Sequence, residues 1–124
     1  MEHFLVDTNI IVDILRGYKP SAELVEALGE VNLSVVSYYE LLQGVENIKE
    51  QKELILFLDN YPIIYLSEVI SRNALSLVTK YNLSHNVQYA DALVASTCLE
   101  HGLTLCTRNI KHFKGINGLK LYDL

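Results

Sequence analysis

The chain has 124 residues, half of them hydrophobic, and a formal net charge of −5. This length suits one domain, residues 1–124, that buries roughly two-thirds of its unfolded surface, and the apolar content excludes a disordered chain. Charged and polar residues interrupt every stretch of about 18 residues, which excludes a membrane span.

Apolar runs alternate with helix-start and turn residues along the whole chain, among them Ser67 as a helix N-cap and Gly102 as a left-handed helix end. In chain order, we expect a strand at 3–6, helices at 10–15 and 21–29, a strand at 31–36, a helix at 38–60, a strand at 63–66, helices at 67–81 and 87–100, and strands at 103–107 and 119–122. Strands separated by helices need crossover connections and form a mostly parallel sheet. We therefore predict an α/β fold, a three-layer α/β/α sandwich with about five strands.

The N-terminal residues and the two cysteines bear on the cellular location of the protein. The opening residues lack the basic and then apolar layout of a secretory signal, so we expect a cytoplasmic protein. Cys98 and Cys106 lie in apolar surroundings without metal-site spacing, and we interpret both as reduced core residues.

Polar residues follow three of the predicted strands. Asp7 follows the first, the segment from Ser37 to Glu40 follows the second, and the segment from Thr107 to Asn109 follows the fourth. Because ligands of parallel sheets bind outside the carboxyl ends of the strands, these residues are expected at one shared edge.

Each of these residues also has a purely structural interpretation. Asp7 is suited to cap the helix that begins near it. Ser37 and Glu40 have the spacing of a capping box. Thr107 and Asn109 are common turn residues.

Asp91 is harder to explain structurally, because its helical neighbours are apolar and no Lys or Arg lies within one turn. A lone carboxylate there costs several kcal/mol unless it is paired or bound to a cation. The structural alternative is an ion pair with a distant basic residue. Together, Asp7, Glu40 and Asp91 indicate a carboxylate cluster that suits Mg²⁺ or Mn²⁺ and the hydrolysis of phosphoryl esters.

Four segments in this order resemble the PIN-domain family, most closely the VapC-type toxin ribonucleases of toxin–antitoxin pairs. They are Asp7–Ile10, Ser37–Leu41, Ala90–Ala95 and Leu105–Phe113, and the resemblance covers essentially the whole chain. It implies an endoribonuclease that depends on Mg²⁺ or Mn²⁺, forms a homodimer and is silenced by a cognate antitoxin.

The resemblance also implies roles for single residues. Asp7 and Asp91 would be the principal metal ligands, and Glu40 would hold a second ion or position the attacking water. Asn109 stands where many members have a fourth acid, so it keeps a carbonyl ligand but loses a charge. The expected substrate-binding residues are Thr8, Asn9, Thr107 and Arg108.

The charge is unevenly distributed. Residues 1–100 carry 14 acidic and 6 basic residues, a net −8, whereas residues 101–124 carry 4 basic residues against Asp123, a net +3. In this basic segment, Arg108 is best suited to contact an RNA phosphate, and we expect His112 to pack beside Phe113. The apolar segment 54–66 exceeds what one helix face and one strand need, which indicates a surface for a second copy or for the antitoxin.

Two other functions remain open at this point. A receiver-like signalling domain would need an Asp at the end of the third strand, where this chain has Leu66 and Ser67. A catalytically weakened PIN-fold module that binds RNA or protein is disfavoured by the three acids, although Asn109 is compatible with it.

Overall fold

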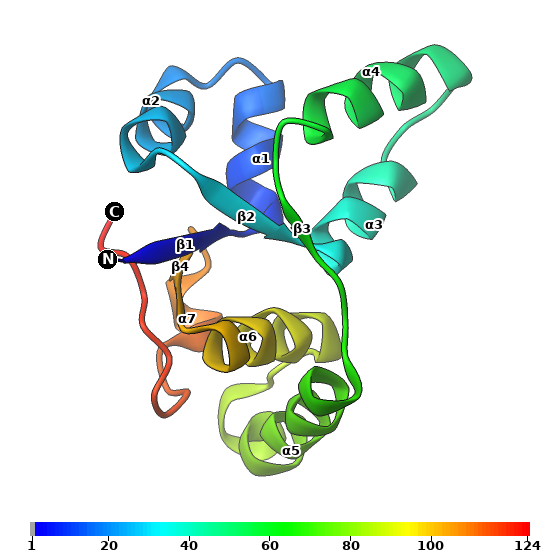
Figure 1. The fold of residues 1–124 in the computed structure, drawn as a ribbon. Helices are drawn as coiled ribbons and strands as arrows, with labels where there is room; N and C mark the ends of the chain where they lie inside the picture. The colour runs from blue at the N-terminus through cyan, green and yellow to red at the C-terminus, as the bar shows by residue number, and fades with distance from the viewer. Residues whose placement is uncertain (1) are drawn as a thin grey trace.

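The computed structural model describes residues 2–124, with helices on both sides of a central sheet (Figure 1). The strands are β1 (His3–Val6), β2 (Val31–Ser34), β3 (Ile63–Ile64) and β4 (Leu103–Cys106). The helices are α1 (Thr8–Leu15), α2 (Lys19–Leu28), α3 (Val35–Gln43), α4 (Ile48–Leu58), α5 (Glu68–His85), α6 (Tyr89–His101) and α7 (Ile110–Phe113).

All four strands are parallel, in the order β3-β2-β1-β4. Helices α1 to α4 lie on one side of the sheet and α5 to α7 on the other, as Figure 1 shows. This arrangement confirms the predicted three-layer α/β/α architecture. The neighbouring strands β1 and β4 end beside each other with Val6 opposite Cys106, and this pairing brings Asp7 and Thr107 together.

Side chains of β1 alternate between the two helical layers, as the pleat of a strand requires. Phe4 and Val6 join a core cluster with α1 to α4, whereas Leu5 joins the cluster formed with α5 and α6. Leu5 and Val6 are both fully buried, so the sheet is apolar on both faces.

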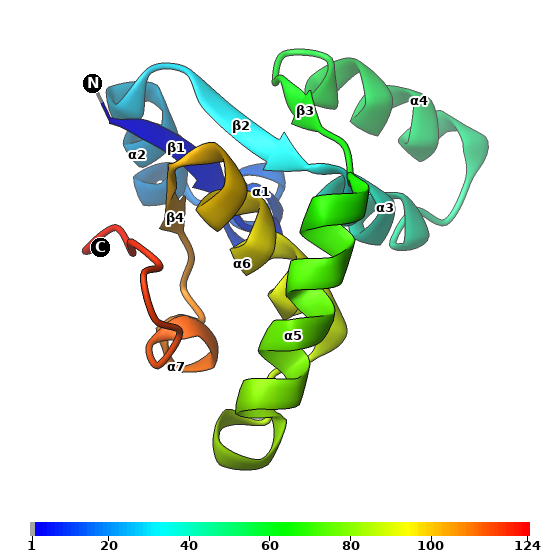
Figure 2. The ribbon, with the colours of Figure 1, turned by 60° about the horizontal axis from the view of Figure 1, so that its bottom comes forward.

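The predicted strand at 119–122 pairs through a single parallel bridge, between Leu105 and Leu121. The two backbone bonds of this bridge, from Leu105 N to Lys120 O and from Tyr122 N to Leu105 O, hold this segment in place. Figure 2 shows the C-terminal segment running back beside β4. The sheet therefore has four strands with an irregular fifth segment at its edge.

The predicted helix at 38–60 was wrong, because the chain forms two helices there. The first ends at the C-cap Gly44, and Asn47 caps the second by accepting a hydrogen bond from Glu50 N at 2.9 Å. The Glu50 carboxylate accepts a hydrogen bond from Glu46 N, one residue before the cap. These two bonds stabilise a second helix start within a continuous apolar pattern.

Several predicted boundaries also differ from the structure. Helix α3 begins at Val35, because Ser34 caps it and β2 ends there. Helix α5 continues to His85, where Asn86 adopts the left-handed conformation. The predicted caps are confirmed at Ser67, which accepts from Ile70 N, and at Gly102, which has a φ of 65°.

Cys98 and Cys106 are free and buried, as predicted. Burial raises the pKa of each thiol to about 12, which removes their reactivity in the folded chain. In the described part of the chain, no helix is long and apolar enough to cross a bilayer.

Candidate active site

All of the predicted site residues except Thr107 line one pocket at the carboxyl edge of the sheet, and its volume is about 270 Å³. We call it the anionic pocket. It is lined by Asp7, Thr8, Asn9, Val12, Glu40, Asp91, Arg108 and Asn109. Three segments far apart in the chain therefore contribute their acids to the same small space.

Asp7 forms the inner part of the anionic pocket, with a relative exposure of 7%. Its Oδ1 accepts from Thr8 N at 2.8 Å, so Asp7 caps α1 as the structural interpretation proposed. Its Oδ2 accepts from the Thr107 hydroxyl at 2.7 Å. Capping and placement in the pocket are thus two roles of one side chain.

Thr107 connects the ends of β1 and β4. Its hydroxyl donates to Asp7 and accepts from Asn9 Nδ2 at 3.3 Å and from Asn109 N at 3.0 Å. Asn9 in turn accepts from Arg108 N at 3.2 Å. The resemblance suggested Thr107 as a substrate contact, but its side chain is fully buried and instead holds Asp7 in position.

Glu40 lies at the exposed rim of the pocket. Thr8 Oγ1 lies 2.7 Å from Glu40 Oε1 and 2.8 Å from Ser37 Oγ. Because a hydroxyl carries one proton, Thr8 donates to the carboxylate and accepts from Ser37. The capping-box interpretation of Ser37 and Glu40 was therefore wrong, because Ser34 begins the helix and the Glu40 carboxylate faces α1.

Asp91 enters the pocket from the first turn of α6, and its side chain is 21% exposed. Burial is the main cause that raises the pKa of Asp91, and the charges of Asp7 and Glu40 raise it further. His112 opposes this shift, because its Nδ1 lies 3.3 Å from Asp91 Oδ2. The charges of Asp7 and Glu40 therefore act on Asp91 across the shared pocket.

The prediction for His112 was wrong, since its ring contacts Asp91. The sequence carries no signal for the pair of His112 and Asp91, because α6 and α7 are separated in the chain by β4 and come together only in the folded structure. Asp13, which had no predicted role, pairs with Arg108 at a distance of 2.9 Å between Oδ2 and Nε. The residues of neither pair, His112 with Asp91 or Arg108 with Asp13, are spaced as neighbours on one helix or one strand would be.

The donor set suits a hard divalent cation, because carboxylate and amide oxygens dominate the pocket. Within residues 2–124, no Lys or Arg lies within salt-bridge distance of Asp7, Glu40 or Asp91. In the same range, no three acidic, His or Cys side chains are close enough to enclose an ion by themselves. This geometry fits Mg²⁺, which is usually held by one or two carboxylates and completes its shell with water and substrate phosphate.

Known proteins resemble this chain along nearly its whole length. The family profile described as PIN domain matches residues 4–119. Ribonuclease VapC10 of Mycobacterium tuberculosis is 34% identical over 120 residues, which cover 94% of this chain and 90% of that protein. Ribonuclease VapC1 of Methanocaldococcus jannaschii is 29% identical over 125 residues, with 96% and 86% covered.

The same similarity holds in three dimensions. A toxin-antitoxin complex from Klebsiella pneumoniae contains a chain that superposes with a TM-score of 0.82 at 27% identity, covering 98% of this chain and 99% of that one. The chain therefore belongs to the PIN-domain family, among the VapC ribonucleases.

Proposed function

We propose that this protein is a metal-dependent endoribonuclease that hydrolyses RNA phosphodiester bonds. The observation that carries the proposal is the anionic pocket, in which Asp7, Glu40 and Asp91 converge without a Lys or Arg partner in the described residues. Such a cluster of like charges is stable only when it is protonated or neutralised by cations.

Mg²⁺ or Mn²⁺ bound here would supply an activated water and stabilise charge on the leaving oxygen. We assign Asp7 and Asp91 as its principal ligands, because both are partly or fully buried and point into the pocket from rigid elements. Glu40, whose Oε1 is held by Thr8, is suited to orient the attacking water through its other oxygen.

Asn109 and Arg108 complete the proposed site at its basic side. Asn109 lines the pocket with a neutral amide, so it contributes an oxygen ligand or a donor but no charge. Arg108 is half-exposed at the same rim, where its guanidinium suits a phosphate contact. The substrate would thus lie between the carboxylates of the pocket and the guanidinium of Arg108.

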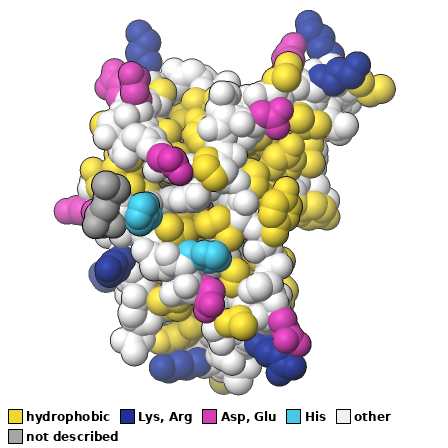
Figure 3. All heavy atoms as spheres, in the orientation of Figure 1, with side chains coloured by type: hydrophobic (Ala, Val, Ile, Leu, Met, Phe, Trp, Pro, Cys, Tyr) yellow, Lys and Arg dark blue, Asp and Glu magenta, His cyan; other side chains and the backbone are white. Residues whose placement is uncertain are grey.

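A toxin role is the biological context we propose, with a cognate antitoxin as partner and the cytoplasm as location. The Klebsiella pneumoniae structure is described as a toxin-antitoxin complex, which supports a protein partner for this chain. Exposed apolar side chains, among them Tyr65, Leu66 and Val69, gather where β3 runs into α5 (Figure 3). They are suited to contact a partner or a second copy in a homodimer.

Cleavage of defined RNAs by the purified protein tests this function. We expect cleavage in Mg²⁺ or Mn²⁺, no cleavage in EDTA, and none by the Asp91→Asn variant. The matched control is Glu100→Gln, which removes an exposed acid from the same helix α6 and should cut like the wild type. Cleavage that survives both EDTA and Asp91→Asn would overturn the proposal, and RNA that is bound but never cut would favour the non-catalytic binding module.

A further inference from the structure

A second cavity adjoins the anionic pocket, and Arg108 is the one residue that lines both. This cavity has a volume of about 410 Å³ and lies between α1, α2 and the C-terminal segment. Its wall is largely apolar and aromatic, with Ile10, Tyr18, Pro20, Leu24 and Tyr122. We call it the tyrosine cavity.

Arg108 is fixed at the boundary between the two spaces. Asp13 binds its Nε at 2.9 Å and is itself held by the Ser21 hydroxyl, which donates to Asp13 Oδ2 at 3.0 Å. The backbone N of Arg108 also donates to Asn9 Oδ1. Asp13 is only 13% exposed whereas Arg108 is 52% exposed, so a buried acid holds an accessible guanidinium.

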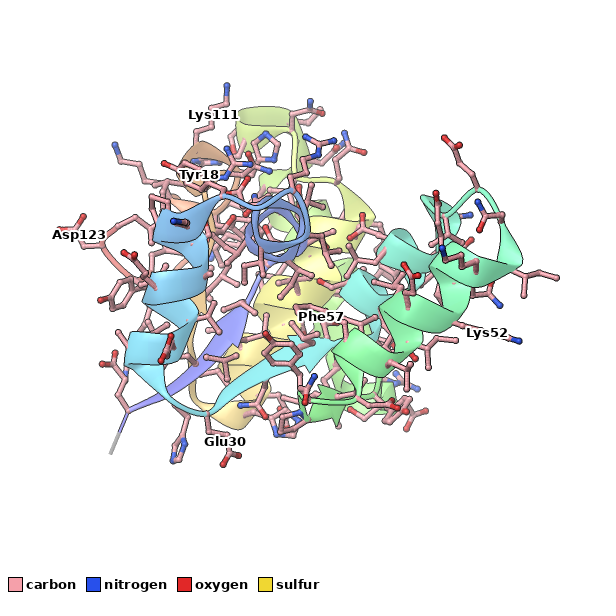
Figure 4. The ribbon with its side chains drawn as sticks, turned by 90° about the horizontal axis from the view of Figure 1, so that it is seen from above. Tyr18, Glu30, Lys52, Phe57, Lys111 and Asp123 are labelled. Atoms are coloured by element: carbon pink, nitrogen blue, oxygen red, sulfur yellow. The ribbon has the colours of Figure 1, made fainter. Side chains whose placement is uncertain are left out.

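The two tyrosines differ in how they are held. Tyr122 makes an edge contact with Phe4, with ring centroids 5.8 Å apart, so its ring is part of the packed wall. Tyr18 is 54% exposed, and its side chain makes no capping bond although it stands at the N-cap of α2. In Figure 4, Tyr18 lies on the connection from α1 to α2, toward the same edge of the molecule as Lys111. Its ring is therefore available to a ligand.

Together these features match the way proteins bind single-stranded RNA. Unpaired bases stack on aromatic rings and on arginine planes, while the guanidinium also binds phosphate. An RNA chain with one phosphate in the anionic pocket would pass Arg108 on its way to the tyrosine cavity. The base of the adjoining nucleotide would then enter that cavity. A volume of about 410 Å³ lies within the range of small-ligand sites, so it accommodates one base.

We infer that the tyrosine cavity binds the nucleobase of a nucleotide attached to the cleaved phosphodiester. In this arrangement Tyr18 is the stacking residue, and Arg108 contacts a phosphate of the same nucleotide. This inference rests on the proposed function, and it names a site that determines where the strand is cut. Asp13 acts as a positioning residue for Arg108. Continuity with the anionic pocket favours RNA over a protein segment as the occupant.

Short RNA substrates with one abasic nucleotide test the inference. After the cut linkage is mapped with the wild type, each neighbouring base is removed in turn and KM and kcat are measured. We expect one position at which base removal raises KM about five- to one-hundred-fold, the range of base stacking on an aromatic ring. Tyr18→Ala should raise KM similarly on intact RNA, and the two losses should not add.

Matched variants separate stacking from general damage. Tyr18→Phe retains the ring and should restore the wild-type KM, whereas Leu83→Ala removes a 98% exposed apolar side chain near the end of α5 and should change nothing. Asp13→Asn should raise KM with little change in kcat, because it loosens Arg108. If Tyr18→Ala and base removal act additively at every position while the wild type cuts RNA, the tyrosine cavity is not a base site. If the wild type never cuts RNA, the proposed function itself fails.

Discussion

The inner part and the rim of the anionic pocket are built differently. Asp7 and Thr107 form the inner part, where both side chains are buried and bonded to each other. Glu40 and Asn109 form the rim, where both are exposed. Thr8 is the one described hydrogen-bond partner of the Glu40 carboxylate, and the Asn109 side chain has none in residues 2–124.

This difference indicates that the inner residues and the rim residues have separate roles. The inner residues also serve the fold, since Asp7 caps α1 and Thr107 joins two strand ends. Their geometry is therefore fixed before any ligand arrives, as an effective ligand set requires. The rim residues are free to adjust, so they are suited to tune the water or substrate.

The largest expected effect comes from Asp7. Asp7→Asn keeps an oxygen that caps α1 but removes the charge, so we expect cleavage to fall by about a thousand-fold or more. Glu40→Gln, at the rim, should lose only about ten- to one-hundred-fold. Single-turnover RNA cleavage by both variants measures the ratio. Equal losses would show that the inner and outer acids are equivalent.

The next effect concerns the support of Asp7. Thr107→Val removes the hydroxyl without changing the side-chain shape and leaves Asp7 Oδ2 without its donor, which costs about 1–3 kcal/mol of unfolding free energy. Cleavage should fall as well, because Asp7 loses its fixed position. Urea denaturation and cleavage rates check both consequences.

Thr97→Val is the matched control for that change. Thr97 is equally buried, but its hydroxyl donates to Leu93 O inside α6 and has no hydrogen bond to the residues that line the pocket in the described chain. We expect a smaller loss of stability, and cleavage like that of the wild type. A Thr107→Val protein that cuts normally would refute the positioning role of this hydroxyl.

The smallest effect is a dependence of stability on pH. Burial, assisted by Asp7 and Glu40, raises the pKa of Asp91 above its ordinary value of 3.8 in the folded chain. The folded state therefore keeps this proton longer, and the free energy of unfolding falls as the pH rises from 3.8 through the folded pKa. Above that window the penalty is complete, and well below pH 3.8 it is absent.

Asp91→Asn should consequently stabilise the metal-free protein at neutral pH. The gain over the wild type should shrink as the pH is lowered through the same window. Denaturation in EDTA at a series of pH values measures this gain, with Glu100→Gln on the same helix as the control. A constant gain at all pH values would assign the effect to packing instead of charge.

The fold followed from the sequence where local signals and tertiary structure agree. Alternating apolar runs and the caps at Ser67 and Gly102 placed most elements correctly. The helix at 38–60 failed because continuous apolar periodicity masked the break at Gly44 and the cap at Asn47. Periodicity reports a buried face, and two successive helices on the same face of the sheet produce the same pattern.

The site was predictable to the extent that strand ends share an edge. That rule brought Asp7, Glu40 and Asn109 together, and Asp91 stood out as a charge among apolar neighbours. The partners of these residues were not predictable. The contacts of His112 with Asp91 and of Arg108 with Asp13 join segments that only the packing of α7 against α6 and of β4 beside α1 brings together.

A titration with Mn²⁺ followed by calorimetry tests the central claim, that acids from separate strand ends and helices form one cation site. We predict saturable binding by the wild type and by Glu100→Gln, and loss of that binding in Asp7→Asn and in Asp91→Asn. At about one hundred times the Kd, the ion should add about 2.7 kcal/mol of stability to the wild type. Equal Mn²⁺ affinity in all four proteins would contradict the account.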